Sequence, residues 1–200
     1  MNLANKITLT RLFLVPVMMA FYLIGYSYSL HMPVVEWAMW TATAVYIIAA
    51  LTDFLDGKVA RKYNMVSNFG KFIDPIADKV LVTAAFIMII DNGAIPVIYG
   101  VIGVTIIITR EFLISGLRQC AAVTGKAIAA DMFGKVKTFV QDITAPIIMM
   151  LPVLVGIVGE WTLYVGYAFY GASVILTILS GINYLFKNRD VIGLGSEKNA

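Results

Sequence analysis

Four aspartates are concentrated in one stretch of the chain. Asp53 and Asp56 lie at the end of one hydrophobic run, and Asp74 and Asp78 open the next. In a helix each residue adds about 100° of rotation, so the members of each pair lie about 60° and 40° apart, on one face. A short turn between two helices would set the pairs opposite each other. Converging carboxylates repel unless cations neutralise them, so the stretch predicts a site for one or two divalent ions, which prefer oxygen ligands.

Small and basic residues accompany the aspartates at fixed offsets. The chain reads DxxDGxxAR over residues 53–61 and, after eight further residues, GxxxDxxxD over residues 70–78. Gly57 leaves room for a nucleotide against the helix backbone, Ala60 keeps the same face shallow, and Arg61 is able to bind a phosphate in bidentate fashion. An acidic pair alone would also be typical of a solvated helix end, but the whole pattern favours a binding site.

The composition indicates an integral membrane protein. Of the 200 residues, 60% are hydrophobic and 14% are charged, whereas soluble domains have about 45–50% apolar and about 25% charged residues. A spanning helix needs roughly 20 largely apolar residues. The predicted fold is an all-α membrane protein, one domain over residues 1–200, with six transmembrane helices at residues 7–26, 36–57, 72–90, 95–116, 136–156 and 162–186. Small residues such as Gly103 and Gly166 suit close contacts between such helices.

The basic residues predict the orientation. All 15 Lys and Arg residues lie at the N-terminus, in or beside the second and fourth connections, or in the C-terminal tail. Because cytoplasmic loops carry an excess of Lys and Arg, both termini and the aspartates are predicted on the cytoplasmic side. Trp37, Trp40 and Trp161 mark the opposite ends of the spans, as interfacial aromatics do. No cleavable signal peptide is expected, because the first apolar run lacks a small-residue cleavage site.

A second group of charged residues is predicted at the depth of the aspartates. Arg110 and Glu111 come near the cytoplasmic end of the fourth span, Arg118 follows it, and Lys135 and Lys137 open the fifth. A charge at the bilayer centre costs about 2.5–3.5 kcal/mol, so such groups usually line a wet cavity or pair with each other. Each cation alone is equally consistent with snorkelling, and Arg110 with Glu111 is consistent with a structural ion pair. Together they favour an anion site beside the aspartates.

Carboxylate-bound metal beside a group of cations suits a substrate that contains phosphates. Metal ions bridge and neutralise pyrophosphate oxygens, and they stabilise the charge that develops on a leaving phosphate. A fourth carboxylate at the edge of such a site is able to accept a proton from an attacking hydroxyl. The residues alone therefore predict a metal-dependent phosphoryl-type transfer at the inner membrane surface.

The pattern over residues 53–78 resembles the signature of the CDP-alcohol phosphotransferase family, whose enzymes transfer a phosphatidyl or related unit from a CDP-linked donor to an alcohol and release CMP. The resemblance implies a homodimer and two Mg²⁺ (or Mn²⁺) ions, with Asp78 as the catalytic base. The implied metal ligands are Asp53, Asp56, Asp74 and Asp78. The residues implied to bind CDP-diacylglycerol are Asn5, Thr8, Gly57, Ala60, Arg61, Ser67 and Gly70.

Further motifs resemble the bacterial members that make phosphatidylglycerophosphate. They are NxxTxxR over residues 5–11, REF over 110–112, SGLR over 115–118, and GKVKT over 134–138 followed by Gln141. The implied acceptor is sn-glycerol 3-phosphate, a dianion that needs several cations. The residues predicted to bind it are Arg110, Arg118, Lys135 and Lys137. The implied location is the bacterial inner (cell) membrane, with the active site facing the cytoplasm.

Two alternatives are compatible with these patterns. The first is the same chemistry with another acceptor, such as inositol phosphate or serine, since inositol phosphate also needs a basic pocket. The second is a divalent-cation or anion transporter, although transporters more often place their sites near the midplane, with repeats or broken helices. The predicted partners are CDP-diacylglycerol, sn-glycerol 3-phosphate and membrane lipid, and no nucleic acid is expected.

Overall fold

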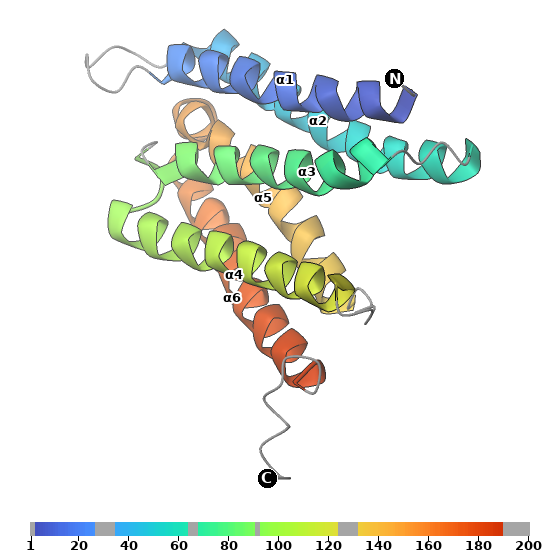
Figure 1. The fold of residues 1–200 in the computed structure, drawn as a ribbon. Coiled ribbons are helices and arrows are strands. Elements are labelled where there is room, and N and C mark those ends of the chain that lie inside the picture. Colours follow the sequence, from blue (N-terminus) through green and yellow to red (C-terminus); the bar gives the residue numbers. More distant parts are fainter. Residues whose placement is uncertain (1–2, 27–34, 64–67, 91–92, 124–131, 190–200) are drawn as a thin grey trace.

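The computed structural model describes residues 3–26, 35–63, 68–90, 93–123 and 132–189; within these ranges, the side chains at 3–7, 53–63, 68–72, 74–75, 78 and 122–123 are outside the description. The described residues form six helices: α1 (Leu3–Gly25), α2 (Glu36–Tyr63), α3 (Asn68–Ile90), α4 (Val97–Val123), α5 (Met132–Val158) and α6 (Trp161–Lys187). Figure 1 shows α1 and α2 on one side of the bundle and α4 and α6 on the other, with α3 and α5 between them.

The prediction of an all-helical chain is confirmed, and most helices extend beyond their apolar segments. The second helix was predicted over residues 36–57, and α2 continues to Tyr63. The fourth was predicted over residues 95–116, and α4 continues to Val123. Backbone hydrogen bonding does not stop where the apolar composition stops, so polar residues at the end of a span extend the same helix.

Burial in this bundle follows the logic of a membrane protein. Met18 of α1, Tyr46 of α2, Phe86 of α3 and Ile148 of α5 belong to one core cluster and are each 0% exposed. The outer helix faces are also apolar, and Phe186 of α6 is 71% exposed. Exposed apolar surface on this scale is unfavourable in water and favourable against acyl chains.

Four of the six helices contain a described segment that is long and apolar enough to cross a membrane: Thr8–Gly25, Val97–Ala121, Met132–Val158 and Trp161–Lys187. In α3 the described apolar segment, Lys79–Ile90, is shorter. The described part of the chain therefore supports a multi-pass membrane protein with four candidate spans.

Small residues allow α6 to approach α4 and α5 closely. A Cβ atom added at Gly103 of α4 would lie 2.4 Å from the hydroxyl oxygen of Tyr170, and one added at Gly166 of α6 would lie 2.2 Å from a methyl carbon of Leu151. The Tyr170 hydroxyl donates to the carbonyl oxygen of Gly100 at 2.8 Å. Glycine at these positions permits the contacts that bring α4, α5 and α6 together, as predicted.

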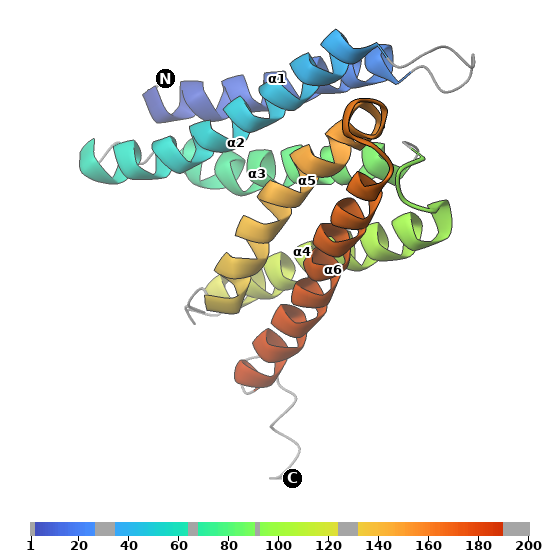
Figure 2. The ribbon, with the colours of Figure 1, turned by 180° about the vertical axis from the view of Figure 1, so that it is seen from behind.

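A tight turn joins the last two helices. Gly159 has a φ of 115°, a backbone conformation that residues with a side chain rarely adopt. The turn reverses the chain between Val158 and Trp161, and Figure 2 shows α5 and α6 running side by side away from it. Because α5 and α6 run in opposite directions, the start of α5, which carries Lys135 and Lys137, lies beside the second half of α6.

Candidate active site

The aspartates lie on two consecutive helices, two on each. Asp53 lies ten residues before the end of α2 at Tyr63, and Asp78 lies ten residues after the start of α3 at Asn68. The two helices contact each other and run in opposite directions from their short connection (Figures 1 and 2). The two acidic pairs therefore lie on neighbouring helices of opposite direction, Asp53 and Asp56 in the second half of α2 and Asp74 and Asp78 in the first half of α3.

This backbone arrangement fits a divalent metal. Carboxylate oxygens are the ligands that Mg²⁺ and Mn²⁺ prefer, and contributions from two helices would allow them to surround an ion. Among the side chains that the structure describes, no group of three or more His, Cys, Asp or Glu residues could hold a metal ion. The four aspartates lie outside those side chains, so their side-chain geometry stays a prediction.

The remaining predicted CDP-binding residues are divided between three helices and a connection. Gly57, Ala60 and Arg61 lie in α2, Gly70 lies in α3, and Asn5 lies in α1. The structure describes the backbone of these five residues but not their side chains, and Ser67 lies outside the described residues altogether. Thr8 of α1 is described and is only 3% exposed. Because α1 packs against both α2 and α3, the N-terminal motif lies on a helix that contacts both aspartate-bearing helices.

Glu111 connects two of the four cations that were predicted to bind the acceptor. The Nη1 of Arg110 donates to its Oε1 at 3.1 Å, and the Nζ of Lys137, from α5, donates to the same oxygen. Lys137 is 1% exposed, and the side chain of Glu111 is 19% exposed. In a semi-apolar environment such charges need close counter-ions. The three side chains, here called the Glu111 cluster, therefore join α4 to α5 and retain one net positive charge.

Side chains of α6 complete this region. The Nη2 of Arg110 donates to Ser180 Oγ at 2.6 Å. Arg118 donates through Nε to the Tyr184 hydroxyl at 3.3 Å, and its guanidinium carbon lies 5.4 Å from the ring centroid, a cation–π contact. Arg110, a member of the Glu111 cluster, thus also links α4 to α6.

A neighbouring glycine makes room for Arg110. A Cβ atom at Gly181 of α6 would lie 3.3 Å from Arg110 Cγ, tighter than ordinary van der Waals contact. The aliphatic part of Arg110 therefore packs directly on the α6 backbone, which leaves its guanidinium at the level of Ser180.

The structure separates the four predicted acceptor cations into two kinds. Arg110 and Lys137 are largely buried and are held by Glu111. Arg118 and Lys135 are exposed, and their charges are therefore more accessible to an incoming anion. All four lie near the end of α4 or the start of α5, and their role as one acceptor site stays a prediction.

The sequence interpretation named Ser173 as a small residue suited to close helix contacts, but it missed the other polar residues on the same face of α6. Ser173, Thr177, Ser180 and Tyr184 are all buried, and their spacing of three or four residues places them on one face. The Nε2 of Gln141 donates to Thr177 Oγ1 at 3.1 Å. Polar residues at helical spacing within an apolar segment predict a helix face that packs against other helices rather than against lipid.

A family model described as CDP-alcohol phosphatidyltransferase matches residues 1–179. The chain belongs to this family. The match spans the aspartate motif, the N-terminal motif and the whole of the Glu111 cluster. As members of the CDP-alcohol phosphatidyltransferase family, the chain and its relatives share the class of reaction that the aspartate pattern predicted.

Curated relatives extend over almost the entire chain. A Bacillus subtilis (strain 168) protein is 38% identical over 201 residues, which cover 96% of this chain and 97% of the relative. A Rickettsia felis protein is 32% identical and a Shigella flexneri serotype 5b protein 34% identical, each over 92% of this chain and 93% of the relative. All three are named CDP-diacylglycerol–glycerol-3-phosphate 3-phosphatidyltransferase.

Proposed function

We propose that this chain transfers the phosphatidyl group of CDP-diacylglycerol to sn-glycerol 3-phosphate, giving phosphatidylglycerophosphate and CMP in phospholipid biosynthesis. The observation that carries the proposal is the full-length relationship to three enzymes of that name, at 32–38% identity. Basic side chains near one end of α4 and α5 support it, because an acceptor that contains a phosphate dianion requires cations.

The proposed topology is six spans with both termini in the cytoplasm of a bacterial cell, within a single domain over residues 1–200. The four described candidate spans and the segregation of the basic residues support it. In this orientation the aspartates and the cation region open toward the cytoplasm, where CMP is released. The homodimer implied by the family resemblance is part of the same proposal.

The proposed donor site lies at the α1–α2–α3 end of the bundle. Asp53, Asp56 and Asp74 would hold a metal ion, and Asp78 would contribute to a second one. The ions, Mg²⁺ or Mn²⁺, would neutralise the pyrophosphate and stabilise the leaving phosphate. The cytidine and pyrophosphate groups contact the small and polar residues of the motifs, which are Asn5, Thr8, Gly57, Ala60, Arg61, Ser67 and Gly70.

The proposed chemical step needs one base. Asp78 accepts the proton of the acceptor hydroxyl, and the resulting oxygen nucleophile attacks the phosphorus that carries diacylglycerol. The bond from that phosphorus to the bridging pyrophosphate oxygen breaks, and CMP leaves with the electron pair. The protein contributes mainly by orienting the two substrates and balancing charge, as in other phosphoryl transfers.

The proposed acceptor site uses the two kinds of cation differently. Arg118 and Lys135, which are exposed, contact the phosphate of sn-glycerol 3-phosphate directly. Arg110 and Lys137 contribute the net positive charge of the Glu111 cluster at the inner wall of the site. This division places charge on both sides of the phosphate while every buried cation keeps a counter-ion.

The deciding experiment measures CMP release by the purified protein from CDP-diacylglycerol and Mg²⁺. Parallel reactions contain sn-glycerol 3-phosphate, inositol 1-phosphate, serine or no acceptor. We expect release with sn-glycerol 3-phosphate only, and its loss when the metal is chelated. Release with a different acceptor would retain the family chemistry and overturn the proposed acceptor site. CMP release that continues unchanged when the metal is chelated would overturn the proposed metal site.

A further inference from the structure

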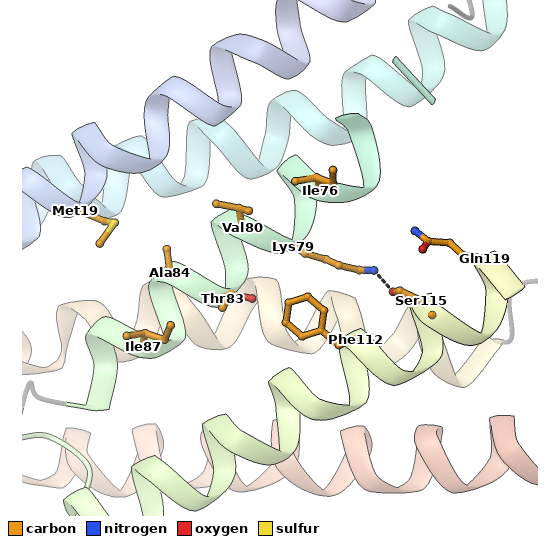
Figure 3. A pocket seen from close by; sticks show the side chains of 11 residues that line it. Met19, Ile76, Lys79, Val80, Thr83, Ala84, Ile87, Phe112, Ser115 and Gln119 are labelled. Carbon is orange, nitrogen blue, oxygen red and sulfur yellow. Dashed lines mark hydrogen bonds between the residues drawn. The ribbon is translucent and has the colours of Figure 1, made fainter. Parts of the chain in front are cut away.

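A cavity of about 620 Å³ lies between α1, α3 and α4. Its volume is within the range of about 300–1,000 Å³ that is typical of small-ligand sites. Figure 3 shows the side chains that face it, with α3 and α4 forming its two long walls and Met19 of α1 at one end. None of the roles proposed above uses this cavity.

The polar groups of the cavity are confined to one end. The Nζ of Lys79 donates to Ser115 Oγ, which donates in turn to the carbonyl oxygen of Glu111 at 2.6 Å. Gln119 lies beside this pair, whereas Met19 and Ile87 lie at the other end (Figure 3). The cavity thus has a cationic, hydrogen-bonding end and an apolar end, which is the polarity of a phospholipid.

The same polarity matches the position of the cavity in the membrane. Lys79 is the first residue of the apolar segment Lys79–Ile90, and Gln119 lies near the end of the candidate span Val97–Ala121. The polar end therefore lies toward a membrane surface and the apolar end toward the bilayer interior. Phe112 is 64% exposed and Ile87 is 50% exposed, so the wall is accessible from the lipid side.

Helix register separates the cavity from the aspartate motif. The α3 residues that line it, from Ile76 to Ile87, recur at intervals of three and four and occupy one face. At about 100° per residue, positions 74 and 78 fall about 150–170° from the centre of that face. The cavity is therefore on the opposite side of α3 from the motif positions.

We propose that this cavity binds an anionic phospholipid of the surrounding membrane, with its phosphate at Lys79 and an acyl chain along Val80 and Ile87. A charged phosphate oxygen is a stronger acceptor for an ammonium group than the neutral hydroxyl of Ser115 is. The apolar wall contributes the area that acyl methylenes bury. Anionic rather than zwitterionic lipid is favoured because Lys79 is the one charged residue among the described side chains that line the cavity.

The test is lipid binding to delipidated protein in a neutral detergent, measured by native mass spectrometry without CDP-diacylglycerol or acceptor. The probes are palmitoyl-oleoyl phosphatidylglycerol and its phosphatidylcholine analogue. We expect one phosphatidylglycerol to bind about fivefold more tightly than phosphatidylcholine, the scale of one basic residue at a membrane surface. Because no turnover is measured, the result is independent of the proposed enzymatic function.

Variants locate the binding within the cavity. Lys79→Gln removes the preference for phosphatidylglycerol, and Lys79→Arg retains it. Gly116→Phe fills the cavity and weakens the binding of both lipids. An added Cβ at Gly116 meets no atom within 4 Å, and the same holds for Gly171, which lines a different cavity between α4 and α6. Gly171→Phe is therefore the matched control, with binding unchanged.

Three results would overturn the proposal. The first is equal affinity of the unaltered protein for the two lipids, or an undiminished preference in Lys79→Gln. The second is competition between CDP-diacylglycerol and phosphatidylglycerol for one site, which would assign the cavity to the substrate. The third is a change of oligomeric state in Gly116→Phe with lipid binding intact, which would assign the cavity to a contact with a second copy of the chain.

Discussion

The two charged regions of this protein are built in opposite ways. The aspartate region lies within residues 53–78, on two helices joined by a short connection, so its members are close in sequence. The Glu111 cluster and its neighbours come from α4, α5 and α6, and the Arg110–Ser180 contact joins residues 70 positions apart. Local connection assembles the first region, whereas helix packing assembles the second.

The regions also differ in how their charge is balanced. The four aspartates, if they converge as predicted, would require cations from outside the chain. Arg110 and Lys137 instead have a counter-ion within the chain, because Glu111 contacts both. Changes in the aspartate region should therefore act mainly on catalysis, and changes in the Glu111 cluster should act on stability and on acceptor binding.

The largest effect is expected from Asp74→Asn, which removes a proposed metal ligand. Turnover should fall by at least about 100-fold, the scale of losing one group that stabilises developing charge, with little change in thermal unfolding. The measurement is CMP release at saturating substrates. Glu36→Gln, an acid at the other end of α2, is the matched control and should retain activity. Near-normal turnover in Asp74→Asn would contradict the proposed site.

Glu111→Gln should mainly reduce stability. Removing one partner of a buried ion pair typically costs about 3–5 kcal/mol, because the remaining charge is left uncompensated. Thermal unfolding in detergent measures the loss, and Glu111→Asp, which keeps the charge, should recover part of it. An unchanged unfolding temperature in Glu111→Gln would show that the cluster does not hold α4 and α5 together.

Arg118→Ala and Lys135→Ala should raise the KM for sn-glycerol 3-phosphate by about tenfold or more, since a hydrogen bond to a charged group contributes about 1.5–3 kcal/mol. The KM for CDP-diacylglycerol should change far less. Steady-state kinetics with each substrate varied in turn measure both constants. Lys187→Ala, at the end of α6, is the control. Equal increases for the two substrates would remove Arg118 and Lys135 from the acceptor site.

The smallest effect is expected from Thr177→Val, which removes the acceptor of the Gln141 hydrogen bond while conserving shape. Hydrogen bonds between membrane helices average about 0.6 kcal/mol and reach about 1.7 kcal/mol. Thermal unfolding should show a loss in this range. In the control Thr41→Val, the affected hydroxyl bonds only to the carbonyl oxygen of Trp37 in its own helix. A greater loss in the control would argue against an interhelical role for Thr177.

Local features of the fold were predictable, and long-range pairings were not. The apolar runs predicted six helices, and the adjacency of Arg110 and Glu111 left open, as an alternative to an anion site, a structural ion pair, which the structure shows. Lys137 pairs with Glu111 although the two residues are 26 positions apart in the sequence, and Tyr184 contacts Arg118 across 66 positions. Such partners depend on how helices cross, which periodicity within a single helix does not determine. The predicted roles of the aspartates stay predictions, because their side chains lie outside the described residues.

The buried polar face of α6 has a consequence for biogenesis. Ser173, Thr177 and Ser180 would be poorly accommodated against lipid alone, yet each is at most 1% exposed in the bundle. Domains and segments emerge from the ribosome in chain order, and α4 and α5 precede α6. The helix therefore enters a bilayer in which Arg110 and Gln141 are already present to receive it. Translated without its predecessors, α6 would still be apolar enough to insert, but its hydroxyl groups would lack the partners that they have in the bundle.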